Sequence, residues 1–206
     1  MKKIEPYSYL VGKVTNIKRG SYIPKKGYQF ILNLLVEGKR KSLNSVLPVI
    51  TYQKQIDFYD IKVEDFLSVL GDLIVTGTDK DPVISVFAKK IKKIEEAEHK
   101  EIISNKEDNN KIVLIGYVSR FPVIIKRMNG KGSYMKVTVA IEKKDQTFDL
   151  IPCTCTLNEQ NSSTLIVGNK VCIVGRLESR NRTKGKSSIV KTVYEISIKH
   201  SARYKL

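Results

Sequence analysis

Four short segments recur in the same order in the two halves of this 206-residue chain. The first reads Leu-Val-Gly-Lys-Val at 10–14 and Leu-Ile-Gly-Tyr-Val at 114–118. The other three pairs are 46–49 with 150–153, 71–77 with 168–175, and 85–91 with 192–198. Such a series at nearly constant spacing indicates two copies of one structural unit. We therefore predict an N-terminal domain over residues 1–94, a linker over 95–110 and a C-terminal domain over 111–206.

Each copy has the residue pattern of a β domain. Apolar and polar residues alternate over 133–142, which is typical of a strand with one buried face. On this pattern Met135 and Val137 face a core, whereas Tyr134 and Lys136 point outward. The predicted strands are 7–17, 27–37, 43–52, 73–78 and 82–93 in the first copy, and 111–120, 133–142, 147–156, 171–178 and 189–199 in the second.

The first copy also predicts a helix between its third and fourth strands. Ile61, Phe66 and Leu70 lie at helical spacing within residues 60–70. The corresponding stretch of the second copy, 158–164, predicts a loop or a single turn. Five strands with a helix between the third and fourth is the order of an OB-fold, a small Greek-key barrel. The predicted fold class is all-β, with two tandem OB-folds.

Charge points to a polyanionic partner. The net charge is +16, from 37 basic and 21 acidic residues, and two basic halves flank an acidic linker. A Lys-, Ile- and Asn-rich composition can also reflect an AT-rich genome, so charge alone does not decide the function. No run reaches the roughly 18 apolar residues of a membrane helix, and the start lacks the pattern of a signal peptide. We expect a cytoplasmic protein with no membrane partner.

Residues for catalysis are sparse. The two histidines, His99 and His200, have no partners at the spacing of a metal site or a catalytic triad. The three cysteines, Cys153, Cys155 and Cys172, fit reduced thiols, and the first two fit small core residues of one strand. We predict a protein that is not an enzyme, with no metal, cofactor or small-molecule substrate.

Binding to a single strand needs cations beside aromatic rings on which bases stack. In the second copy Phe148 and Tyr134 are the first candidates for stacking, Lys136 lies beside Tyr134, and Tyr117 is a further candidate. Tyr194 and its counterpart Phe87 share a face with apolar residues and are interpreted as core. The candidate phosphate contacts of this copy are Arg120, Lys126, Arg127, Lys131, Arg176, Arg180, Arg182, Lys184 and Lys186.

The first copy has a similar basic loop with fewer aromatic residues. The position that aligns with Phe148 is Asn44, which cannot stack comparably. We therefore expect residues 110–206 to contribute most of the strand binding. The candidates in the first copy are Lys18, Arg19, Tyr22, Lys25, Lys26, Lys39, Arg40 and Lys41.

Residues 110–198 resemble the bacterial single-stranded DNA-binding protein family. The matching segments are 110–116, Phe121-Pro122, 139–141, 148–153, 168–171 and 175–177. The resemblance implies an OB-fold that binds single-stranded DNA, and it places Phe148 where the family has a base-stacking aromatic.

Several features depart from the family pattern. The sequence ends in a short basic stretch, where family members have a long tail with an acidic tip, so we do not expect partner recruitment by that route. It has no tryptophan, and Arg182 stands near a position that is often aromatic. Because the family commonly works with four OB-folds, two per chain imply a homodimer; a monomer whose copies mimic a dimer is the alternative.

The leading hypothesis is sequence-tolerant binding of single-stranded DNA in replication, recombination or repair, by stacking and phosphate contacts. One alternative is a protein-interaction or assembly module, because OB-folds host many functions. Another is binding of single-stranded RNA, since stacking does not itself distinguish the two nucleic acids.

Overall fold

The computed structural model describes residues 5–38, 44–78, 81–104, 109–126, 132–143, 145–183 and 190–204. The first half contains β1 (Tyr7–Ile23), β2 (Gly27–Val36), β3 (Ser45–Tyr52), α1 (Gln53–Tyr59), β4 (Phe66–Thr78) and β5 (Asp81–Ile94). A helix, α2 (Glu96–Ser104), follows within the predicted linker. The second half contains β6 (Asn110–Val118), β7 (Val123–Lys126), β8 (Ser133–Glu142), β9 (Phe148–Thr156), α3 (Glu159–Thr164), β10 (Lys170–Thr183) and β11 (Val190–Arg203).

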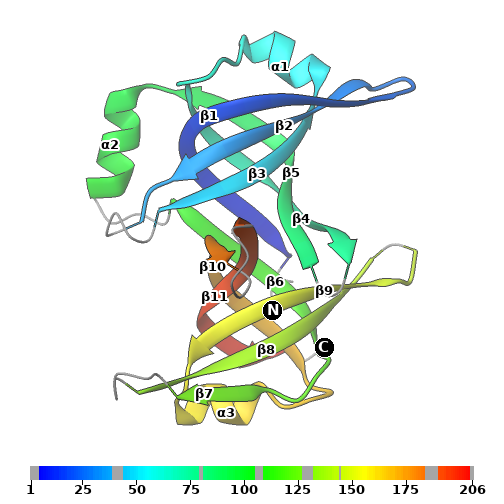
Figure 1. Ribbon diagram of the computed structural model, residues 1–206, viewed down its shortest axis with the longest axis vertical. Helices are drawn as coiled ribbons and strands as arrows, with labels where there is room; N and C mark the ends of the chain where they lie inside the picture. The colour runs from blue at the N-terminus through cyan, green and yellow to red at the C-terminus, as the bar shows by residue number, and fades with distance from the viewer. Residues whose placement is uncertain are drawn as a thin grey trace.

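Each half forms a five-stranded barrel with the same connections (Figure 1). In the first barrel β1 pairs with both β2 and β4, β2 with β3, and β4 with β5, all antiparallel. A short parallel contact between β3 and β5 closes it. The second barrel repeats these pairings with β6, β8, β9, β10 and β11. This is the OB-fold order, and the prediction of two tandem OB-folds is confirmed.

The barrels are joined edge to edge. β1 pairs antiparallel with β6, from Tyr7 opposite Val113 to Leu10 opposite Asn110, so one 11-stranded sheet runs through both barrels. At the seam the hydroxyl of Ser179 accepts from the Val46 amide (3.0 Å), and the Ser179 amide donates to the hydroxyl of Ser45 (3.2 Å). These contacts fix how the two barrels face each other.

Gly71 and Gly175 occupy equivalent places in the two barrels, whereas the third repeated segment of the sequence pairs Gly71 with Gly168, so that alignment is wrong. Gly71 lies opposite Ala88, Gly175 lies opposite Ile198, and a β-bulge precedes each glycine. A Cβ on Gly71 would lie 2.1 Å from the carbonyl oxygen of Phe87, and one on Gly175 would lie 2.5 Å from that of Ser197. Glycine is therefore required where the strand bends at close range to its neighbour.

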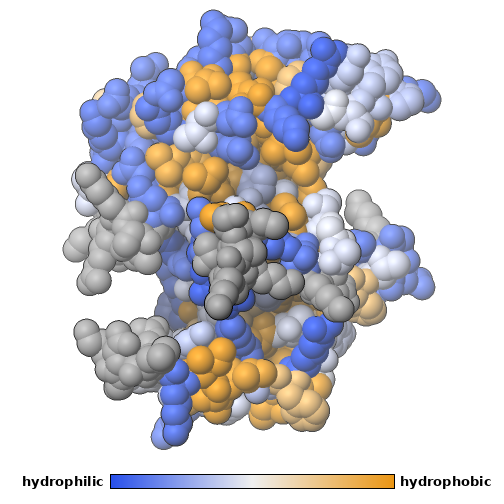
Figure 2. All heavy atoms as spheres, viewed as in Figure 1, coloured by the Kyte–Doolittle hydropathy of each residue, from blue (hydrophilic) through white to orange (hydrophobic). Residues whose placement is uncertain are grey.

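Both barrel interiors are filled by branched aliphatic residues such as Leu32, Val69, Leu114 and Ile173, all at most 1% exposed. Cys153 and Cys155 are buried in the second core, as the sequence predicts. Burial raises the pKa of the Cys155 thiol to about 11, so this group is not a thiolate near neutral pH. Apolar side chains also reach the surface over β2 and β3 (Figure 2).

The helix of the first barrel lies earlier than predicted. α1 spans Gln53–Tyr59, and it ends at Asp60, whose φ of 43° is left-handed. The predicted helical stretch 60–70 instead forms a turn and the start of β4, in which Leu67 and Val69 are buried while Leu70 is exposed. The spacing of apolar residues there fits period two better than a helical period.

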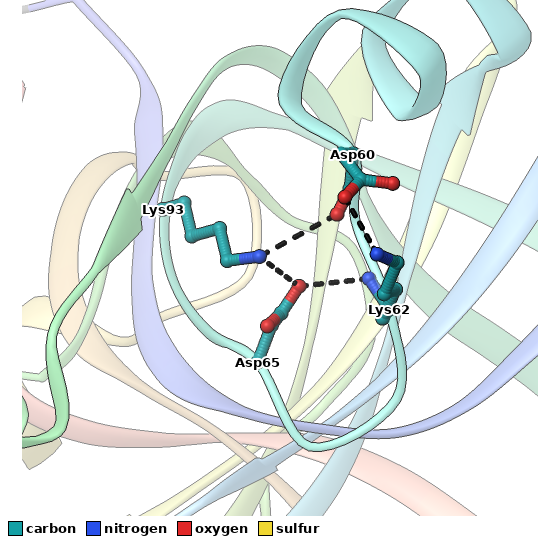
Figure 3. A network of polar contacts seen from close by, with 4 residues as sticks. All are labelled: Asp60, Lys62, Asp65 and Lys93. Atoms are coloured by element: carbon teal, nitrogen blue, oxygen red, sulfur yellow. Dashed lines mark hydrogen bonds and ion pairs between the residues drawn. The ribbon is translucent and has the colours of Figure 1, made fainter.

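A polar network holds that turn (Figure 3). The Lys93 ammonium contacts the Asp65 carboxylate at 2.7 Å and donates to the carbonyl oxygen of Asp60 at 3.4 Å. The Lys62 amide donates to the same Asp65 carboxylate at 2.8 Å, and its ammonium pairs with the Asp60 carboxylate at 2.6 Å. These bonds tie the connection between α1 and β4 to β5.

Three further elements refine the sequence predictions. Residues 123–126 form the edge strand β7 where a loop was expected, and 159–164 form the short helix α3. β4 begins at Phe66, well before the predicted start at 73. Within the described ranges, no helix has both the length and the apolar character needed to cross a membrane.

Candidate nucleic-acid interface

The outward surface of β8 and β9 carries three of the predicted contact residues. Lys136 lies opposite Thr154, Tyr134 opposite Thr156, and Glu142 opposite Phe148. The alternate residues of both strands fill the core, so these side chains point away from it. Phe148 is 51% exposed, which leaves its ring free to stack on a base. We call this surface, with Leu150 and Pro152 between its ends, the β8–β9 face.

A cavity of about 360 Å³ adjoins the β8–β9 face. Its lining comes from β8, β9, β10 and β11, and consists of Tyr134, Thr154, Cys155, Thr156, Glu178, Arg180, Glu195, Ser197 and Ile198. Arg180 forms an ion pair with Glu195 at 2.8 Å, and the Glu195 side chain is only 11% exposed. Burial raises the pKa of Glu178 above its ordinary value of 4.5. The cavity therefore combines one aromatic ring with two carboxylates, which charge patterns in the sequence did not predict.

The predicted arginines of β10 share one strand face. Arg176 is half-buried near the seam, where its guanidinium lies 3.5 Å from the side-chain oxygen of Asn109. Arg180 is held by Glu195, and Arg182 is exposed further along the strand. Arg176, Arg180 and Arg182 all occupy even positions of β10, so their side chains lie on the same outer face of the strand. They form a row along the cavity, and Arg180 is part of its lining.

The remaining predicted residues of the second barrel lie outside the cavity lining. Tyr117 is 37% exposed at the end of β6, beside Ala140 of β8, and the Lys170 ammonium lies 5.4 Å from its ring centre. Lys126 is exposed at the end of the edge strand β7, and Arg120 is exposed in the connection before it.

The β1–β2 hairpin of the first barrel brings its predicted residues together. The guanidinium of Arg19 lies 3.3 Å from the ring centre of Tyr28, which meets the exposed Tyr22 edge-on at 5.2 Å. The Lys26 ammonium lies 5.1 Å from the ring centre of Tyr52 and donates to its hydroxyl at 3.4 Å. Lys18 and Lys25 lie on the same hairpin, Lys25 in the turn.

An aromatic pair on the first barrel was missed by the sequence reasoning. Tyr52 and Phe87 meet edge-on, with ring centres 5.5 Å apart. Phe87 was interpreted as core because it shares parity with the buried Ile91. The β-bulge between Leu70 and Gly71 reverses that parity, so Phe87 and Ile91 lie on opposite faces. Tyr194 of the second barrel does pack against the core, as expected, but the residue equivalent to Phe87 is Ser197 and not Tyr194.

Seven predicted contact residues lie outside the described residues: Lys39, Arg40, Lys41, Arg127, Lys131, Lys184 and Lys186. They remain predictions.

The two barrels, their shared edge and the β8–β9 face define a tandem OB-fold protein. Residues 109–204 match the model of the single-strand binding protein family. This C-terminal half of the chain belongs to that family, as the resemblance predicted.

Solved structures extend the likeness to the whole chain. A deletion variant of the single-stranded DNA binding protein from Thermus aquaticus superposes with a TM-score of 0.72 at 15% identity, over 98% of this chain and 95% of that one. The wild-type Thermus aquaticus protein gives 0.70 at 15% identity, over 98% and 94%. At this low identity, the two superpositions establish that both barrels share the fold of the Thermus aquaticus protein. No curated protein sequence matches the chain significantly.

Proposed function

We propose that this protein binds single-stranded DNA without catalysis, by stacking bases on aromatic rings and pairing phosphates with lysine and arginine. The main observation in support is that each barrel has aromatic rings beside lysine or arginine side chains on its outer surface. On the second barrel Phe148 and Tyr134 share a face with Lys136. On the first barrel Tyr52 lies under Lys26 and against Phe87.

This chemistry is tolerant of sequence. Every base has a π face, and each stacked ring contributes roughly 1–3 kcal/mol. Cations that neutralise phosphates release counterions, so affinity falls as salt rises. Membership of residues 109–204 in the single-strand binding protein family supports this proposal. Proteins of this chemistry act on strands exposed in replication, recombination or repair, and we propose that role here.

Both barrels contribute to the proposed site. The second barrel carries the exposed Phe148 and the row of arginines on β10. The first barrel adds the pair Tyr52 and Phe87, so its contribution is larger than the sequence alone suggests. The strand binding that we expected mainly from residues 110–206 is therefore proposed to extend over both.

We also propose that the chain works as a homodimer. The face of the sheet formed by β4, β1 and β6 carries the exposed Leu70 opposite the half-buried Tyr9, with the half-buried Ile115 further along. A second copy packed on this face would cover these residues. Light scattering should give twice the chain mass of 23.4 kDa, and Leu70→Glu should halve it. The chain mass alone for the unaltered protein would contradict the dimer.

The central test is a titration of intrinsic fluorescence. The protein has ten tyrosines and no tryptophan, so bound bases should quench tyrosine emission. We expect tight binding of a long oligo-dT at low salt, weaker binding of duplex DNA, and a linear fall of log affinity with log salt, with a slope of about −0.7 for each phosphate contacted. Absence of binding to both oligo-dT and oligo-dC at low salt would refute the proposal, and equal affinity for matched RNA would make RNA an equal substrate.

A further inference from the structure

We propose that the cavity beside the β8–β9 face is a base-reading subsite that accepts a base with an exocyclic amino group and rejects thymine and uracil. Glu178 supplies the hydrogen-bond acceptor. This inference rests on the proposed binding of single strands. It adds a base preference to a surface otherwise expected to be indifferent to sequence.

The cavity has the size of a small-ligand site, and its lining is mainly polar. Its volume of about 360 Å³ lies at the lower end of the range for such sites, which suits a single base. Tyr134 forms part of its wall, so a base that enters meets an aromatic ring as well as polar groups. Thr154 and Thr156 of β9, the strand paired with β8, also line the cavity.

Charge decides which part of a nucleotide can enter. Glu178 and Glu195 lie opposite each other on β10 and β11. Arg180 forms its ion pair with Glu195, whereas the charge of Glu178 is stabilised by the nearby charges of Arg176 and Arg180. Ser197 donates a hydrogen bond to Glu178, and burial raises the pKa of this carboxyl. Because two arginines balance the two carboxylates, the cavity has no net positive charge to attract a phosphate, whereas a neutral base can enter without that need.

The edge of the base then decides affinity. A carboxylate only accepts hydrogen bonds, so it matches the amino group of cytosine, adenine or guanine. Thymine and uracil present two carbonyl oxygens around a single N–H, and these oxygens repel a carboxylate. With such a base bound, Glu178 keeps Ser197 as a donor but gains none from the base, so the mismatch costs free energy.

The first barrel supports this assignment by contrast. The parallel pairs Ile50–Phe87 and Thr154–Ser197 occupy the same place in the two barrels. Counting from Gly71 and Gly175, the position of Glu178 is occupied by Ile74 in the first barrel. Apolar and aromatic residues there can stack on any base, whereas the polar set of the second barrel can read a base edge. The two copies have thus diverged at several neighbouring positions in this part of the barrel.

The test compares oligo-dC with oligo-dT of equal length near neutral pH, by tyrosine fluorescence, for the full chain and for Glu178→Gln. Glutamine keeps the shape but can donate as well as accept, so it should lose the preference. Removing a negative charge strengthens binding of every strand, but the ratio of the two affinities cancels that effect. Glu159→Gln, on the exposed surface of α3, is the matched control for lost charge.

We expect the unaltered protein to favour oligo-dC, and Glu178→Gln to reduce the ratio by roughly 5- to 150-fold, the range of one good base contact. Glu159→Gln should leave the ratio unchanged. If both oligomers bind and Glu178→Gln has the same ratio as the unaltered protein, the subsite is refuted while the proposed function stands. If neither oligomer binds, the proposed function itself fails.

Discussion

The side chain of Asn110 pairs with the backbone of Leu177 as a neighbouring strand would. Its amide nitrogen donates to the Leu177 carbonyl oxygen at 2.7 Å, and its oxygen accepts from the Leu177 amide at 2.9 Å. Both residues are buried, and Asn110 also lies opposite Leu10 in the ladder that joins the barrels. The side chain of Asn110 therefore satisfies both the N–H and the C=O of Leu177 on β10, where the two barrels meet.

Replacing Asn110 by alanine should destabilise the protein markedly. Both backbone groups of Leu177 would lose their partner in a buried place, at a cost of roughly 1–3 kcal/mol for each group. Urea unfolding should show a midpoint shift that corresponds to about 2–6 kcal/mol. Asn181→Ala is the matched control, because Asn181 accepts from Thr192 (3.1 Å) at an exposed site. Equal stability of the two variants would contradict this role.

Phe148→Ala should weaken single-strand binding without unfolding the barrel. The ring is half exposed, so its loss removes stacking area and little core packing. We expect a fall in affinity for oligo-dT of roughly 5- to 150-fold, which corresponds to 1–3 kcal/mol. Phe58→Ala is the control, because Phe58 is 76% exposed on α1, at the far end of the other barrel (Figure 1). A similar loss in both variants would place the strand elsewhere.

The fold was predictable because each copy repeats the pattern that an OB barrel needs. The alternation over 133–142 corresponds to β8, with Met135, Val137 and Val139 buried. This alternation depends on local sequence, so it can be read from the chain. Gly71 and Gly175 fill equivalent close approaches, but their equivalence depends on strand register, and the repeat in the sequence pairs Gly71 with Gly168 instead.

The face of the first barrel was not predictable in the same way. Strand parity carried from Ile91 to Phe87 gives the wrong side, because a bulge inserts a residue and reverses the alternation. The ion pair of Arg180 and Glu195 was also hidden, since it depends on which strands become neighbours. Register between distant strands, more than residue type, determines these parts of the site.

Exchanging the aromatic pair of the first barrel should test its share of binding. Tyr52→Thr with Phe87→Ser introduces the residues found at the equivalent positions, Thr156 and Ser197, which the barrel fold already tolerates. The double variant should bind oligo-dT at least about fivefold more weakly, because one stacked ring contributes roughly 1–3 kcal/mol. Unchanged affinity, with the midpoint of unfolding also unchanged, would confine strand binding to the second barrel.

The stability of the protein should fall on acidification because of His99. This residue of α2 is buried against Phe66, with ring centres 4.4 Å apart, and its Nε2 has no hydrogen-bond partner among the described residues. Burial lowers its pKa below the ordinary value of 6.5, although Glu37 and Glu96 oppose the shift and Lys100 adds to it. The unfolded chain therefore takes up the proton first.

The stabilising effect of neutral His99 is thus present above pH 6.5 and is lost as the pH falls through the lower pKa of the folded state. His99→Phe keeps a ring against Phe66 and cannot titrate. We expect the free energy of unfolding of the unaltered protein to drop more between neutral pH and pH of about 5 than that of His99→Phe, measured in urea at both values. Substitution of the exposed His200 by glutamine controls for the other histidine. Parallel pH dependence of the unaltered protein and His99→Phe would show that His99 does not couple proton uptake to the packing of α2.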